Sequence, residues 1–131
     1  MSAIDELLAG ARSTLDRADP LRAQRLQSGG ALVVDIRPHA NRLAEGEIPG
    51  SVVVERIHLE WRLAPDSEWK LPGVTPETVA IVVCNEGYSS SLAAADLQRL
   101  GLPGATDLAG GFRAWAAAGL PVVPGGSPAV P

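Results

Sequence analysis

Three short apolar runs, each bounded by turn or polar residues, constrain the fold of this chain more than any other feature. They lie at residues 31–34, 51–54 and 79–83, and they are built mostly of valine, with alanine, leucine, isoleucine and, at the start of the second run, Ser51. Continuous apolar runs of this length are typical of strands that are buried on both faces, as in parallel sheets. A shorter and weaker run at residues 105–108 predicts a fourth strand.

Segments with helical spacing alternate with these runs. Their apolar residues recur at intervals of three and four, and proline and glycine stand where helices start and stop. Strands that alternate with helices predict an α/β domain, with a parallel sheet of about five strands flanked by helices on both faces. The predicted helices span residues 3–18, 20–27, 90–100 and 112–118, with one further turn at 59–63 inside a long connection.

The chain divides into three predicted parts. Residues 1–19 are expected to form an N-terminal helical extension, residues 20–123 the α/β domain, and residues 124–131 a flexible tail of proline, glycine and small residues. Hydrophobic residues make up 46% of the 131 positions, which is enough for the packed core of one domain. Trp61 and Trp69 are expected to cap this core, and Trp115 to lie within it.

Charge and composition exclude several classes of partner and site. The formal net charge is −4, and no basic patch of the kind that binds nucleic-acid phosphates is present. No apolar run approaches the roughly 18 residues of a membrane span. The first ten residues carry two acidic residues and no cation, unlike a secretory signal, so a cytoplasmic location is expected. A single cysteine excludes an internal disulfide and a multi-cysteine metal site, and no metal is expected.

Cys84, the only cysteine, stands where an α/β sheet binds its ligands. Ligands bind at the carboxyl ends of parallel strands, and Cys84 directly follows the third apolar run. The segment from Cys84 to Ser90 has the order strand, tight loop, helix, with Gly87 at the turn. Amides in such a loop and in the first helical turn can converge on a thiolate, a persulfide or an oxyanion. The competing interpretation is a buried cysteine that packs as a small hydrophobic residue.

Four stretches, in order along the chain, resemble the motifs of a known family. Over residues 20–123 the chain resembles single-domain rhodanese-like sulfurtransferases. The stretches are Val33-Val34-Asp35-Ile36-Arg37, similar to the first core strand with its Asp-x-Arg; Gly46-Glu47-Ile48-Pro49-Gly50-Ser51, similar to a Gly-His-Ile-Pro-Gly-Ala turn with Glu47 in place of histidine; Val82 through Ser90, similar to the active-site loop; and Leu108 through Trp115, similar to a Gly-Gly-x-x-x-Trp signature.

The resemblance implies that Cys84 is a nucleophile that accepts a sulfane sulfur as a persulfide. The sulfur then passes to a thiol or another acceptor, and the donor is a small sulfane-sulfur compound or a persulfidated protein. Neither a cofactor nor a metal is implied. Two alternatives remain open: a rhodanese-like module that binds a partner without catalysis, and a redox-responsive thiol. The expected substrate- or anion-binding loop consists of Asn85, Glu86, Gly87, Tyr88, Ser89 and Ser90.

The loop departs from the family pattern at one position. The family loop commonly runs Cys-x-x-Gly-x-Arg before a serine, and here Ser89 replaces the arginine while Glu86 adds a negative charge. Because an arginine fork binds oxyanions through two hydrogen bonds, its absence favours an uncharged or protein-bound persulfide donor over thiosulfate. It also argues against a cysteine phosphatase, whose loop arginine holds the phosphoryl oxygens. A serine hydrolase is excluded because no histidine follows the loop serines.

Charged residues after the first two runs are candidates for the rim of the pocket. Asp35, Arg37 and Arg56 fall at the expected carboxyl edge of the sheet. Asp35 and Arg37 also fit an ion pair that holds the loops around the strand end, and Arg56 also fits a solvated surface position. His39 and His58 are possible bases for Cys84, but both are expected at the surface because nothing in the sequence orients them.

Overall fold

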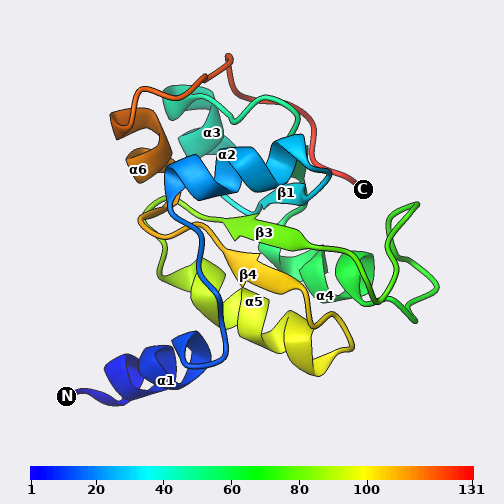
Figure 1. The fold of residues 1–131 in the computed structure, drawn as a ribbon. Coiled ribbons are helices and arrows are strands. Elements are labelled where there is room, and N and C mark those ends of the chain that lie inside the picture. Colours follow the sequence, from blue (N-terminus) through cyan, green and yellow to red (C-terminus); the bar gives the residue numbers. More distant parts are fainter.

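A parallel four-stranded sheet forms the centre of the computed structural model, which describes residues 1–131 (Figure 1). The strand order is β2-β1-β3-β4, and every neighbouring pair runs parallel. The strands are β1 (Leu32–Asp35), β2 (Val52–Val53), β3 (Ala80–Val83) and β4 (Ala105–Asp107). The helices are α1 (Ala3–Arg12), α2 (Pro20–Ser28), α3 (His39–Glu45), α4 (Leu59–Leu63), α5 (Ser89–Arg99) and α6 (Gly111–Ala117), with a 3-10 turn at Arg56–His58.

The sheet has four strands where the sequence predicts about five. A fifth segment reaches the edge beside β4 through a single parallel bridge between Ala18 and Leu108. It pairs no further because Asp19 caps α2 and Pro20 occupies its first position, so the chain turns away from the sheet. The predicted α/β class and the parallel sheet are confirmed.

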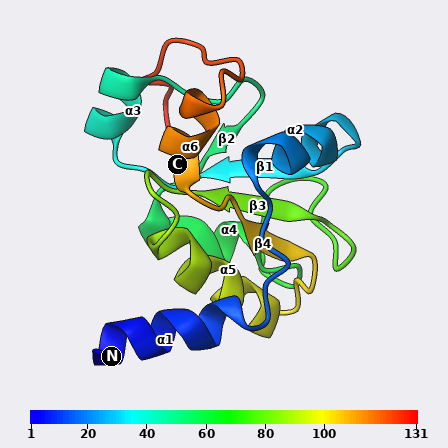
Figure 2. The same cartoon turned by 60° about the vertical axis from the view of Figure 1, so that its left-hand side comes forward.

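Helices cover both faces of the sheet, as predicted. Successive side chains of a strand point to opposite faces, so Val34 and Val82 enter one buried cluster while Val33 and Ile81 enter the other. Figures 1 and 2 show α2, α3 and α6 on one side of the sheet and α4 and α5 on the other, with α1 beyond α5. Trp115 lies in the core, as predicted. The longest helix has 11 residues, and none has the length and apolar character that crossing a membrane requires.

Helix α1 is shorter than the predicted helix at residues 3–18. It begins with a capping box between Ser2 and Asp5 and ends at Arg12. The chain then leaves the helix and runs toward β4, where the Ala18 N–H donates to the Asp107 carbonyl at 3.1 Å. Pairing with the sheet edge therefore overrides the helical pattern after residue 12.

Two short elements and two tryptophans differ from the sequence-based predictions. Helix α3 and the 3-10 turn were not predicted, because the buried residue of α3 is the charged Arg42 and a turn of three residues is too short to show a period. Trp61 and Trp69, predicted to cap the core, are 58% and 63% exposed. Their long connection extends away from the sheet instead of folding over it (Figure 1).

The C-terminal tail has no helix or strand, yet it is hydrogen bonded to a buried carboxylate. Glu47 accepts hydrogen bonds from the N–H groups of Gly126 and Ser127 and from Arg42 Nη1, the last at 2.8 Å. Burial raises the pKa of Glu47, but the hydrogen bonds from Ser127 and Arg42 outweigh it and lower the pKa overall. The flexibility of residues 124–131 stays a prediction, and motion there would break these contacts.

Candidate active site around Cys84

Cys84 lies at the carboxyl edge of the sheet, directly after β3. It belongs to the apolar cluster between the sheet and α5, and 9% of its surface remains exposed. The backbone N–H groups of Gly87 and Ser90 are directed at its sulfur, with N···Sγ distances of 3.2 and 3.4 Å. The hydroxyl oxygen of Ser90 lies 3.2 Å from the same sulfur. The loop therefore directs two amide donors at Sγ, while the Ser90 oxygen accepts from the Cys84 S–H and the Ser90 hydroxyl donates to Asp107.

Donors outside the loop hold four of its carbonyl groups. The chain contains no cis peptide, and in a trans peptide the N–H points opposite to the carbonyl. The N–H groups of Asn85, Glu86, Tyr88 and Ser89 consequently point away from these donors, and they donate to no acceptor in the chain. The outside contacts are Phe112 N–H to Cys84 O at 2.8 Å, Arg113 N–H to Asn85 O at 3.1 Å, the Arg12 and Arg17 guanidiniums to Gly87 O at 2.8 and 2.9 Å, and Ser91 N–H to Tyr88 O at 3.1 Å.

Two glycines make this arrangement possible. Gly87 has φ +85° at the turn of the loop, and Gly111 has φ +66° at the start of α6. A Cβ on Gly111 would stand 2.5 Å from the carbonyl carbon and oxygen of Asn85 and 2.6 Å from the Cys84 oxygen. Only glycine lets the first turn of α6 approach the loop closely enough for its amides to hold the loop carbonyls.

A buried carboxylate lies behind the loop. Asp107, the last residue of β4, is fully buried and accepts hydrogen bonds from the hydroxyls of Ser90 and Ser91 at 2.7 and 2.8 Å. Arg17 Nε lies 2.9 Å from its other oxygen. Ser90 thus connects Asp107 with the Cys84 sulfur. The sequence analysis missed Asp107, although a charged residue that ends a strand at the ligand edge is a signal that could have found it.

Asp35 and Arg37, the predicted rim residues, lie inside the protein. They form an ion pair at 2.8 Å with both side chains about 1% exposed. The Arg37 guanidinium packs 3.9 Å from the centre of the Phe112 ring, and its Nη1 lies 3.4 Å from the side-chain oxygen of Asn85. These residues support the loop from within, which fits the structural interpretation of the pair better than a place on the rim.

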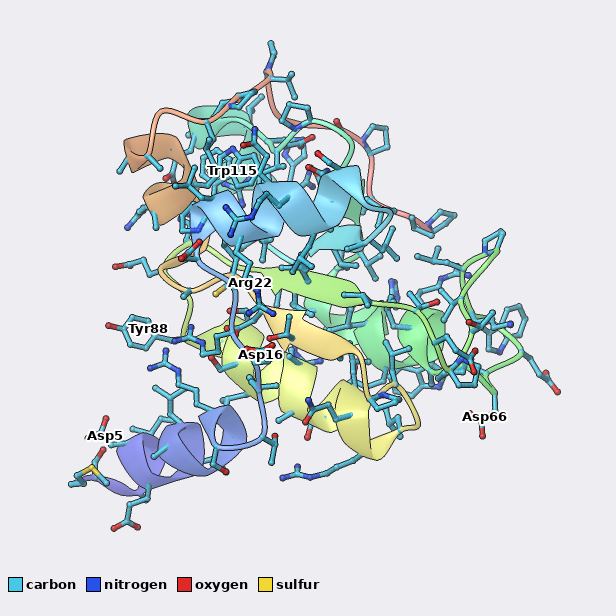
Figure 3. The ribbon with its side chains drawn as sticks, in the orientation of Figure 1. Asp5, Asp16, Arg22, Asp66, Tyr88 and Trp115 are labelled. Atoms are coloured by element: carbon cyan, nitrogen blue, oxygen red, sulfur yellow. The ribbon has the colours of Figure 1, made fainter.

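Three loop residues, Glu86, Tyr88 and Ser89, face the solvent. Figure 3 shows Tyr88 extending outward from the body of the protein. Glu86 lies 3.1 Å from Arg113, which also contacts Glu45 at 3.1 Å. The hydrogen bond from Arg113 lowers the pKa of Glu45, and one from Asn85 adds to it against the opposing effect of burial. Arg113 is thus shared by two carboxylates, Glu45 and Glu86, at the outer side of the loop.

Arg56 and the two histidines do not contact Cys84. Arg56 forms ion pairs with Glu60 at 2.9 Å and Asp96 at 3.8 Å, and it lines a hollow of about 350 Å³ together with Arg37. His39 and His58 are exposed, as expected. No three His, Cys, Asp or Glu side chains gather where they could hold a metal ion.

Fold and site together define a parallel α/β protein whose single cysteine lies in an amide-lined loop between a strand and a helix. A model of the rhodanese-like domain matches residues 19–118. The chain belongs to the rhodanese-like domain family.

Similar proteins agree with this assignment. The thiosulfate sulfurtransferase GlpE of Stutzerimonas stutzeri is 36% identical over 76% of this chain and 83% of its own, and that of Ectopseudomonas mendocina is 37% identical over 80% and 88%. A Rhodopseudomonas palustris structure, described as of unknown function and a possible tyrosine phosphatase, has a TM-score of 0.82 at 31% identity and covers 93% of this chain and 95% of its own. The human single-domain sulfurtransferase has a TM-score of 0.60 at 26% identity, over 77% and 96%.

Proposed function

We propose that this rhodanese-like protein is a sulfurtransferase that carries sulfane sulfur as a persulfide on Cys84. The Cys84 thiolate attacks the outer sulfur of a donor, the donor's S–S bond breaks, and the remainder leaves as an anion. A thiolate acceptor then attacks the outer sulfur of the persulfide and releases the Cys84 thiolate. Each step exchanges one sulfur–sulfur bond for another, so no cofactor is required. The relatives named thiosulfate sulfurtransferase support this class of reaction.

The observation that carries the proposal is the direction of the loop amides. Two of them point at Sγ, and four more have no acceptor in the chain. A persulfide adds a second sulfur that carries negative charge, and unpaired N–H groups around it stabilise that charge without any reorganisation of the loop. A cysteine that served only as packing would not need amides directed at its sulfur.

The test is whether Cys84 itself becomes persulfidated. Intact-mass spectrometry after incubation with a sulfane-sulfur donor should show an adduct of about 32 Da, one sulfur atom. A thiol acceptor should remove the adduct, and Cys84→Ser should never form it. Absence of the adduct from the wild-type protein with both small and protein-bound donors would instead identify a binding module without sulfur transfer.

We further propose that the preferred donor is uncharged or protein-bound, because Ser89 leaves the mouth of the loop without an arginine. Ser89 is exposed at the first position of α5, so an arginine can be accommodated there. Ser89→Arg should raise the rate of sulfur transfer from thiosulfate to cyanide by about tenfold, because the guanidinium fork binds the sulfonate oxygens. Steady-state kinetics with thiosulfate measures the effect.

The matched control is Ser89→Gln, which adds similar length without charge and should leave the thiosulfate rate near that of the wild type. Equal rates for the wild-type protein and Ser89→Arg would mean that charge at this position does not select the donor.

Phosphatase activity, which the description of the Rhodopseudomonas palustris structure raises for that protein, is not favoured here. The arginine with which a cysteine phosphatase holds phosphoryl oxygens is Ser89 in this chain. The negative charge on the sulfur of a persulfide needs no arginine, since the loop amides can stabilise it.

A further inference from the structure

Two arginines that precede the matched family region contact the active-site loop. Arg12 ends α1 and Arg17 lies in the segment that follows, both before residue 19, where the family match begins. Their Nη2 atoms donate to the same acceptor, the Gly87 carbonyl oxygen, at 2.8 and 2.9 Å. Figures 1 and 2 show how this is possible, since α1 lies along α5, whose first turn continues the loop.

The charges of the two arginines are balanced differently. Arg17 is paired with the buried carboxylate of Asp107. Arg12 has no carboxylate within ion-pair distance; its Nε donates to the Ser91 hydroxyl at 3.1 Å, and its guanidinium lies 5.5 Å from the centre of the Tyr88 ring. The N-terminal extension therefore brings one uncompensated positive charge to the loop. The loop itself has no arginine, because Ser89 stands at the position where the family commonly has one.

We propose that Arg12 and Arg17 are positioning residues of this site. They hold the Gly87 carbonyl, so that the Tyr88 N–H of the same peptide points away from the two guanidiniums and stays without an acceptor in the chain, and they polarise that peptide from outside the loop. The proposal rests on the proposed function in so far as the sulfur being stabilised is that of a persulfide. It makes the N-terminal extension a part of the active site.

The extent of one structural match agrees with this role. The Rhodopseudomonas palustris structure aligns with 93% of this chain, more than the region 19–118 of the family model. Part of the extension therefore has a structural counterpart in a protein of the same fold.

Arg12→Met is the decisive variant, because it removes the charge and the donors but breaks no ion pair. Arg25→Met is the control. Arg25 is an exposed residue of α2 that forms no ion pair or side-chain hydrogen bond, so this variant removes the same charge at a position far from the loop. Arg12→Lys restores a donor for the Gly87 carbonyl. Thermal unfolding of each variant shows that the fold is kept.

Alkylation of Cys84 is the first measurement, because it does not depend on sulfur transfer. Iodoacetamide is uncharged and iodoacetate is an anion of nearly the same shape. We expect Arg12→Met to slow the reaction of Cys84 with iodoacetamide by about fivefold, since the loop amides around the sulfur are no longer held in place, and to slow the reaction with iodoacetate at least as much. Arg12→Lys should recover most of the rate, and Arg25→Met should match the wild type.

Transfer kinetics are the second measurement. With thiosulfate and with an uncharged organic trisulfide as donors, Arg12→Met should lower kcat by about tenfold and change KM little, because an oriented amide acts on the reacting sulfur. An unchanged iodoacetamide rate, or losses confined to iodoacetate and to KM for thiosulfate, would overturn the positioning role and make Arg12 at most a binder of anionic reagents. If the wild-type protein forms no persulfide, the proposed function fails, while the iodoacetamide rates still decide whether Arg12 positions the loop.

Discussion

Gly111→Ala should abolish persulfide formation on Cys84, with a loss in rate of about a hundredfold or more. The added Cβ would stand 2.5–2.6 Å from backbone atoms of Asn85 and Cys84, which cannot move aside as a flexible side chain can. Either the loop or the first turn of α6 must shift, and the hydrogen bonds from the Phe112 and Arg113 amides to the loop carbonyls are lost. We also expect a loss of about 3 kcal/mol in the free energy of unfolding, from overpacking and from the positive φ.

Gly119→Ala separates the effect of overpacking from the effect of the positive φ. Gly119 has φ +74°, similar to that of Gly111, but no atom lies within 4 Å of the position of a Cβ. The variant should therefore lose only about 1 kcal/mol in stability and keep the wild-type rate of persulfide formation. Mass spectrometry at timed intervals gives the rates, and denaturant unfolding gives the stabilities. A wild-type rate in Gly111→Ala would show that α6 does not determine the position of the loop amides.

The fold could be predicted because its strands are buried on both faces. Strands β1 and β3 contact helices on each side of the sheet, so every residue in them is apolar until the strand ends at the carboxyl edge. The helices beside them carry ordinary start and stop residues. The prediction failed where long-range contacts decide the structure: residues 13–18 follow a helical pattern, but pairing of Ala18 with the sheet edge draws them out of the helix.

The residues of the site also divide into those that the local sequence predicts and those that long-range contacts place. Cys84 and its loop follow from local order, since a strand, a glycine turn and a helix start place amides around the first residue after the strand. Arg12 and Arg17 could not be found in this way, because each lies 70 or more positions from the loop carbonyl that it contacts. Arg17 and Asp107 are 90 positions apart, and Arg12 and Gly87 are 75 apart. Nothing in the local sequence distinguishes Arg12 and Arg17 from surface charges, whereas the position of Asp107 at the end of a strand was a usable signal.

Asp107→Ala should lower the free energy of unfolding by about 3 kcal/mol, because a buried ion pair loses one partner. The Asp107 side chain is fully buried, while that of Arg17 is 21% exposed, so water partly solvates the arginine that is left. The variant also removes the acceptor of the Ser90 hydroxyl and the nearer of the two acceptors of the Ser91 hydroxyl. Asp66→Ala is the control: Asp66 is exposed in the long connection, far from the loop (Figure 3), and its removal should change the stability by less than about 0.5 kcal/mol.

A double-mutant cycle tests whether the cost arises from the pair. Arg17→Met alone leaves the carboxylate without its cation inside the protein, and Asp107→Ala alone leaves the guanidinium without its carboxylate. In the double variant no unpaired charge remains, so the combined loss in the free energy of unfolding should be smaller than the sum of the two single losses by about 1 kcal/mol or more. Strictly additive losses in urea unfolding would mean that Arg17 and Asp107 act independently, and that the loop is not tied to β4 through their ion pair.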